Sequence, residues 1–197
     1  QYTLLFDSGI INSSESYNVT CSDMKIPYAA DCKAVVTVTD NKNNTAQAQC
    51  FFSTAPDDTF WQNAKWIKPL EHISGWAPYL RTKFTTEHKE VFKAVMYACG
   101  LGCAEYYVNG EKTNDYYIDP PMTNYEKTVL YRSFDVTDKI KDGGNCVCIL
   151  LGEGFYSQSR VWDYKGFVYG DVCAIAKLVI TYTDGTVQEI VTDIDNW

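Results

Sequence analysis

Apolar and polar residues alternate along much of this chain, in short runs that turn-forming residues separate. Residues 33–40 (KAVVTVTD) alternate apolar and polar positions, and residues 45–54 (TAQAQCFFST) do so again after an asparagine-rich segment. A period of two is typical of β-strands, so the pattern predicts a hairpin with a five-residue loop. The same criterion predicts strands at 79–86, 91–100, 104–108, 128–134, 145–151, 173–182 and 186–193.

Several short motifs mark where these strands turn or bend. Asn109-Gly110 and Asp184-Gly185 each join two alternating runs, as in type I′ turns whose two central residues both take positive φ. Gly100 and Gly102 predict a bend or bulge within a strand. Asp135 is expected to cap a short helical turn that follows it.

The strand pattern predicts an all-β fold, because apolar residues nowhere recur at helical spacing for more than about two turns. A polar segment containing Pro56 divides the chain. We expect residues 1–56 to be part of a fibronectin-type-III or immunoglobulin-like β-sandwich, truncated at its start. Residues 57–197 are expected to form a jelly-roll-like β-sandwich.

Composition narrows the classes of function. The 197-residue chain carries a net charge of −8 and no basic run, which argues against binding to nucleic acid. No apolar run approaches the roughly 18 residues of a membrane span, so no membrane partner is expected. The opening QYTLLFDSGII lacks a basic segment before its apolar residues, so we interpret it as a cut upstream of a strand and not as a signal peptide.

Eight cysteines are present, and none shows the C-x-x-C spacing of a zinc site. Cys146 and Cys148 fall on one face of an expected strand beside isoleucine and leucine. We favour buried free thiols over disulfides, which the even count leaves possible. Free thiols favour a reducing environment, without separating a cytoplasmic protein from an exported one.

No catalytic residue is expected in the chain. The nucleophile motif G-x-S-x-G is absent. The GLGCAE segment at 100–105 begins like a dinucleotide-binding loop, but Glu105 replaces the third glycine and a strand follows. The acids Asp115, Asp119, Glu153 and Asp163 could supply a glycosidase pair, yet scattered acids of this kind usually form a solvated surface.

Residues 151–170 (LGEGFYSQSRVWDYKGFVYG) combine aromatic side chains with acids and an arginine. Sugars stack on flat aromatic faces while charged groups meet their hydroxyls, so this loop suits a sugar. The alternative is that Phe155, Tyr156 and Tyr169 plug the end of the sandwich, and the sequence leaves both open. The candidate sugar-binding residues are Asn109, Asp119, Tyr125, Glu153, Tyr156, Arg160, Trp162, Asp163 and Tyr164. Asn109, Asp119 and Asp163 also offer oxygen ligands for Ca²⁺.

Six motifs, in order, carry a resemblance to a known family. They are AKWI (64–67), YLRTKF (79–84), KAVMYACGLGCAEYYVNGEKTND (93–115), DPPMTNYEKTVLYRSFDVTDKI (119–140), GGNCVCILLGEGFY (143–156) and ITYTDGTVQEIVTDIDNW (180–197). From residue 64 the chain resembles the N-terminal β-sandwich domain of bacterial α-L-rhamnosidases. Residues 37–55 are similar to the fibronectin-like module that precedes this domain.

The resemblance implies a glycoside hydrolase whose chemistry belongs to a separate α/α barrel, so the fragment itself is expected to be inactive. Its implied partners are that barrel and a rhamnose-containing glycan, which some related domains hold through Ca²⁺. Asn109 and the loop after GEGFY are the matching positions, whereas Met122 and Phe155 replace tryptophans of the family. The resemblance also places the 119–121 loop beside the 152–170 loop. A purely structural scaffold and an adhesion or protein-interaction sandwich remain the alternatives.

Overall fold

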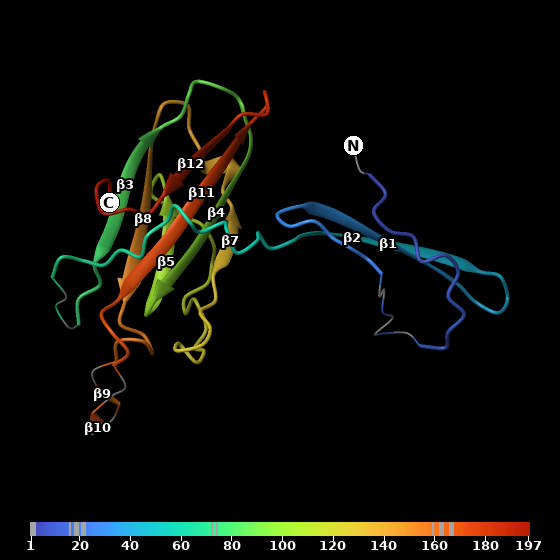
Figure 1. Cartoon of the computed structure of the whole chain (residues 1–197), viewed down its shortest axis with the longest axis horizontal. Coiled ribbons are helices and arrows are strands. Elements are labelled where there is room, and N and C mark those ends of the chain that lie inside the picture. The colour runs from blue at the N-terminus through green and yellow to red at the C-terminus, as the bar shows by residue number, and fades with distance from the viewer. Residues whose placement is uncertain are drawn as a thin grey trace. The chain divides into compact units, whose positions relative to one another are not determined.

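The chain forms two compact units, residues 1–60 and residues 61–197 (Figure 1). The computed structural model describes residues 3–15, 17, 20, 23–71, 73, 75–158, 160–161, 164–165 and 168–197, with the backbone alone at 160–161 and 164–165. These residues contain β-strands and one short 3₁₀ helix. No helix among them has the length and apolar character needed to cross a membrane.

The first unit contains the expected hairpin. β1 (Asp31–Thr39) pairs antiparallel with β2 (Thr45–Ser53), and residues 40–44 form the five-residue loop. The Asp40 carboxylate holds this loop by accepting hydrogen bonds from the backbone nitrogens of Lys42 and Asn44, each 2.8 Å long. Because these are the two strands described in residues 1–60, the fibronectin-like module stays a prediction.

The second unit is a sandwich of two four-stranded antiparallel sheets, so the β-sandwich prediction is confirmed, whereas its jelly-roll description stays a prediction. In order, the first sheet contains β12 (Val187–Val191), β11 (Cys173–Tyr182), β4 (Val91–Leu101) and β7 (Arg132–Asp135). The second sheet contains β3 (Tyr79–Thr85), β8 (Gly144–Gly152), β5 (Cys103–Val108) and β6 (Glu111–Lys112). A further small hairpin joins β9 (Arg160–Val161) to β10 (Tyr164–Lys165).

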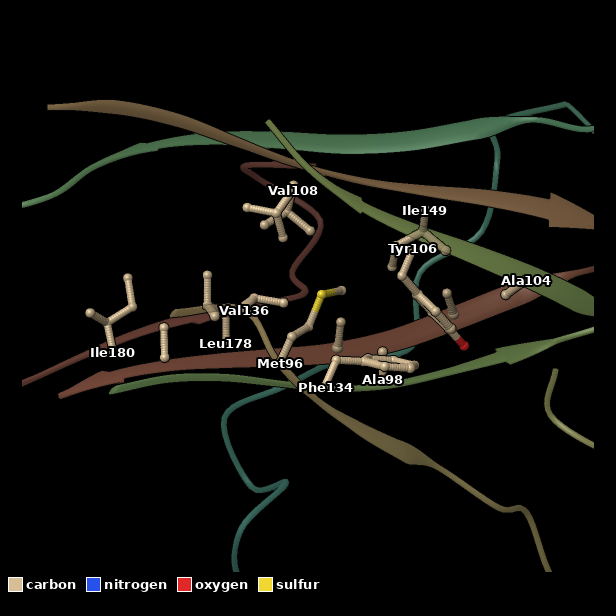
Figure 2. Packing of buried hydrophobic residues seen from close by; sticks show 14 of the residues in the cluster. Met96, Ala98, Ala104, Tyr106, Val108, Phe134, Val136, Ile149, Leu178 and Ile180 are labelled. Atoms are coloured by element: carbon tan, nitrogen blue, oxygen red, sulfur yellow. The ribbon is translucent and has the colours of Figure 1, made fainter. Parts of the chain in front are cut away.

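The core lies between the two sheets. Every second residue of β5 and β8 is buried, as the alternating pattern predicts. Figure 2 shows Met96 and Phe134 from the first sheet facing Tyr106 and Ile149 from the second. The rings of Tyr106 and Phe134 lie 5.2 Å apart between centroids. This layer contains the fully buried apolar side chains that stabilise the unit.

Gly102 carries the chain from the first sheet to the second. It lies between β4 and β5 with φ +124°, and a Cβ there would come 2.0 Å from the carbonyl oxygen of Gly152. At Gly100 a Cβ would come 2.4 Å from the Cβ of Ala104. The bend expected from the two glycines is therefore confirmed. The chain passes from β4 to β5 at Gly102, where the backbone of Gly152 leaves no room for a side chain.

The two predicted type I′ turns have different outcomes. Asn109 and Gly110 have φ values of +52° and +84°, and Val108 pairs with Glu111, so that prediction is confirmed. The prediction for Asp184-Gly185 is wrong, because Gly185 alone takes positive φ, at +82°. The Gly185 nitrogen instead donates to the Tyr182 oxygen and the Tyr182 nitrogen to the Thr186 oxygen, which makes a three-residue loop.

The strand expected at 128–134 is shorter than predicted. β7 covers Arg132–Asp135, while Val129 and Tyr131 pack against the outer side of the first sheet. After β7, Thr137–Lys139 form the 3₁₀ helix η1. The N-cap of η1 is Val136, with no side-chain cap hydrogen bond, so the predicted cap by Asp135 is wrong. The Asp135 carboxylate instead accepts a hydrogen bond from the nitrogen of Thr137, the first residue of η1, at 3.0 Å.

Seven cysteines lie in the described part of the chain, and all seven are free thiols, in agreement with the favoured prediction. Cys21 lies outside the described residues. Cys99 and Cys32 are buried. Cys146 and Cys148 share one face of β8, but this is the half-buried outer face, since Val147 and Ile149 occupy the core side. The expected burial of these two thiols is therefore only partial.

Candidate functional site

The two long connectors of the sandwich meet at one edge. Residues 113–131 join β6 to β7, and residues 153–172 join β8 to β11. In Figure 1 both lie at the lower end of the sandwich, in yellow and orange. The Ala104 nitrogen, at the start of β5, donates a 2.7 Å hydrogen bond to the Asp119 oxygen. Cys103 pairs with Gly152 across the sheet, so the expectation that these connectors share an edge is confirmed.

Three tyrosines join the connectors. The ring of Tyr125 meets that of Tyr156 edge-on at 5.3 Å between centroids, and that of Tyr169 at 5.2 Å. Tyr156 and Tyr169 stack at 6.0 Å. Tyr125 and Tyr156 also pack against a second apolar cluster that includes Cys99 and Leu101. Burial raises the pKa of both tyrosine hydroxyls. Tyr125 and Tyr156 therefore cover the outer side of the first sheet, where the second apolar cluster lies. Of the three residues in the plugging alternative, only Tyr156 packs in this way, since Phe155 and Tyr169 are among the exposed large apolar side chains.

Asp119 anchors its connector from the inside. The residue is only 1% exposed, and its Oδ1 accepts a 2.5 Å hydrogen bond from Nε of Arg132. The guanidinium of Arg132 in turn lies over the ring of Tyr116, 4.5 Å from its centroid. Removing either charge would leave the other without its partner, so this pair fixes the course of the 113–131 connector. Arg132 is a residue that sequence reasoning missed, although a buried acid requires such a counter-ion.

Asn109 lies at the other end of β5. Its side-chain nitrogen donates to the Lys139 oxygen at 2.7 Å and to Oδ1 of Asn145 at 2.8 Å. Its Oδ1 accepts from the Cys146 nitrogen at 2.9 Å. Both polar atoms of the Asn109 amide therefore form hydrogen bonds within the sandwich. Asn109 also lines an open pocket of about 400 Å³, together with Lys83 and Phe84.

The structure does not bring the proposed Ca²⁺ ligands together. Asp119 contacts Ala104 at the start of β5, whereas Asn109 follows its end. Five residues of extended strand separate these points by about 17 Å, too far for one ion. The expectation that Asn109 and Asp119 share one Ca²⁺ ion is therefore wrong, because β5 places them at its opposite ends. Asp163 lies outside the described residues, and the residues that the structure does describe contain no group of three His, Cys, Asp or Glu that could hold a metal.

Glu153 connects the edge to a segment distant in sequence. Its Oε1 accepts a 3.1 Å hydrogen bond from the Gly75 nitrogen. The next residue, Trp76, is 70% exposed. Phe155 and Tyr169 at the same connector are also substantially exposed, at 45% and 43%. The described edge therefore carries the Glu153 carboxylate on the same connector as the exposed Phe155 and Tyr169, in contact with the residue before Trp76. Sequence reasoning missed Trp76, because its distance from Glu153 along the chain hides their proximity.

The remaining candidates lie in or beside the β9–β10 hairpin. Arg160 pairs with Lys165, and Tyr164 pairs with Val161, along the backbone. The side chains of Arg160 and Tyr164, and all of Trp162 and Asp163, lie outside the described part of the structure. The sugar-binding roles of these residues stay predictions.

Comparison with known proteins gives the family. The model of the α-L-rhamnosidase N-terminal domain matches residues 89–197. An α-L-rhamnosidase from Formosa agariphila is 30% identical over 223 aligned residues, which cover 98% of this chain and 23% of the relative. One from Streptomyces avermitilis is 31% identical, over 71% of this chain and 14% of the relative. The chain thus spans less than a quarter of the length of these relatives.

Solved structures agree with the sequence comparison. The α-L-rhamnosidase of Dictyoglomus thermophilum is 28% identical with a TM-score of 0.74, over 86% of this chain and 20% of that one. The enzyme of Streptomyces avermitilis, solved in complex with L-rhamnose, is 25% identical with a TM-score of 0.58, over 82% and 18%. The family match spans more than half of the chain and includes every strand of the sandwich except β3, so the chain belongs to the α-L-rhamnosidase N-terminal domain family.

Proposed function

We propose that this chain is a non-catalytic accessory part of an α-L-rhamnosidase that acts on rhamnose-containing glycans. In this role the sandwich packs on the catalytic α/α barrel of the same parent enzyme, outside the sequence described. The family match over residues 89–197 carries the proposal. The relatives' names support the substrate class, and their greater length leaves room for a separate catalytic domain.

We further propose that the connector edge binds the sugar. Its support is that Glu153 and the exposed Phe155 and Tyr169 lie on one connector, and that Glu153 bonds to Gly75, next to the exposed Trp76. Flat rings suit the apolar face of a pyranose, and a carboxylate accepts hydrogen bonds from its hydroxyls. In this arrangement Tyr125 and Tyr156 pack against the second apolar cluster and do not contact the sugar.

Calorimetric titration of the 197-residue chain with L-rhamnose, with and without Ca²⁺, tests the binding role. We expect saturable heat that D-glucose does not reproduce. Trp76→Ala should weaken binding about threefold to tenfold, the contribution of one aromatic contact. Phe92→Ala is the matched control, because Phe92 is 68% exposed near the other end of β4. From the sequence, Trp162→Ala is also expected to weaken binding without unfolding the domain.

A purely structural role is the second candidate. It is favoured by the internal engagement of Asn109, Asp119, Tyr125 and Tyr156, whose side chains bond or pack within the sandwich. Absence of heat at millimolar L-rhamnose, with and without Ca²⁺, would remove sugar binding and leave this scaffold role. Deleting residues 61–197 from the parent enzyme should abolish its activity under either role. Full activity after that deletion would overturn the accessory role itself.

A further inference from the structure

β8 presents two thiols on the outer face of its sheet. Cys146 and Cys148 are two residues apart, and both are half-buried with their neighbours Val147 and Ile149 directed to the core. The Cys146 thiol donates a weak hydrogen bond, 3.7 Å long, to the Val147 carbonyl oxygen. We propose that Cys146 and Cys148 together bind one soft, two-coordinate metal cation such as Cu(I).

Strand geometry favours a metal bridge over a disulfide. Two residues of an extended strand span about 6.6 Å, which is also the approximate separation of their Cβ atoms. A disulfide requires Cβ atoms about 3.8 Å apart. β8 is paired on both sides, with β3 and with β5, so its backbone cannot easily contract by this amount. A metal adds two metal–sulfur bonds between the sulfurs, each about 2.3 Å long in zinc sites, and this longer bridge fits the spacing.

The number of ligands selects the kind of metal. In the described part of the chain no three His, Cys, Asp or Glu side chains are grouped to hold an ion, so the pair supplies two protein ligands. Structural Zn²⁺ takes four ligands, and Ca²⁺ takes six to eight oxygens. Thiolates select Cu(I), zinc and iron–sulfur clusters, and of these Cu(I) is the one that accepts two sulfur ligands alone.

Positive charges on the neighbouring strand β3 would stabilise the negatively charged Cu(I) complex. Binding converts two thiols and one monovalent cation into a dithiolate complex of charge −1 and releases two protons to solvent. The strand register places Arg81 opposite Cys148 and Lys83 opposite Cys146, where both cations can stabilise that anion. Burial raises the pKa of the Cys148 thiol, Cys146 raises it further, and Arg81 lowers it. A cation between the sulfurs replaces the thiolate repulsion with attraction.

Anaerobic titration of the reduced 197-residue chain with Cu(I), against a chromophoric Cu(I) chelator, tests the site. We expect one tightly held equivalent that disappears in Cys146→Ser and equally in Cys148→Ser. Each single change should weaken it about 100-fold, because the second thiolate acts as an intramolecular ligand. Circular dichroism checks that the variants keep the sheet, which is expected because both side chains are only half-buried.

Cys103→Ser is the matched control, since Cys103 is a half-buried thiol at the start of β5 without a second cysteine at the same spacing. It should keep the tight equivalent unchanged. The proposal is overturned if either single variant of the pair retains that equivalent, or if Cys103→Ser loses it. It is also overturned if the unmodified chain holds no Cu(I) against the chelator.

Discussion

At the level of single residues, Gly102 is the described glycine at which a Cβ atom would make the shortest contact. Its spacing from Gly100 predicts a bend from sequence, because glycine tolerates backbone conformations that other residues avoid. What the sequence cannot show is the Gly152 carbonyl, which approaches the position of a Cβ to 2.0 Å. That contact arises from pairing with β8, about fifty residues further along the chain.

Gly102→Ala should therefore destabilise the sandwich strongly. Positive φ strains an alanine, and the clash with a backbone oxygen cannot be relieved by rotating a side chain, so we expect a loss of about 3 kcal/mol. Urea unfolding followed by tryptophan fluorescence measures the change. Gly144→Ala is the control, because a Cβ there meets nothing within 4 Å. It should change the free energy of unfolding by less than about 1 kcal/mol, and equal effects of the two substitutions would refute the explanation.

Some residues of the candidate site can be predicted from the sequence, and others cannot. Residue type alone predicts Tyr125 and Tyr156 as members of the edge, and their rings do meet there. Oxygen chemistry alone groups Asp119 with Asn109, yet the two lie at opposite ends of β5. The ion pair of Asp119 with Arg132 and the approach of Gly75 to Glu153 depend on how the connectors pack, which no local pattern encodes.

Among the elements, paired strands are predicted from the sequence more accurately than the connectors between them. Alternation predicted β11 at its observed bounds, Cys173–Tyr182, because both neighbours of the strand are also strands. The run at 128–134 has similar composition, but its first residues pack over the second apolar cluster instead of pairing. Apolar alternation records burial on one side, and it does not distinguish a paired strand from a covering loop.

The β11–β12 hairpin carries a prediction about pH. Hydrogen bonds from Thr186, followed by one from Lys89, lower the pKa of the Asp184 carboxyl to about 2 from a usual value of 3.8. Because the folded pKa is the lower one, this stabilisation is complete above about pH 4 and is lost as the pH falls toward 2. Asp184→Asn should therefore lower the urea midpoint at pH 7 and reduce its dependence on pH in that acid range.

Thr186 supplies the matched pair of variants for this hairpin. Its hydroxyl donates to Oδ1 of Asp184 at 2.5 Å, so Thr186→Ser keeps the bond and Thr186→Val removes it. Only the valine variant should reproduce part of the reduced acid sensitivity of Asp184→Asn. Urea midpoints at pH 7 and below pH 3 provide the comparison. Equal acid sensitivity in all three variants and the parent chain would assign the acid response to other carboxylates.

At the scale of the whole molecule, the two units differ in how their apolar residues are covered. Both apolar clusters consist of residues from 61–197, including Trp61 and Trp197 at its two ends. In residues 1–60, as far as they are described, Cys32 is the one buried apolar side chain. The register of β1 and β2 places Val36 opposite Ala48 and Val38 opposite Ala46, on an apolar face that is exposed.

Residues 61–197 should therefore fold alone, whereas residues 1–60 should not. The sandwich contains its own core, so the fragment is expected to unfold cooperatively in urea with the midpoint that the sandwich shows in the whole chain. Residues 1–60 should give no cooperative transition, because a two-stranded hairpin is marginal in water. Circular dichroism of both fragments makes the comparison. A sandwich that requires residues 1–60 for its transition would contradict this division, and would mean that Trp61 and the second apolar cluster are insufficient to close that side of the fold.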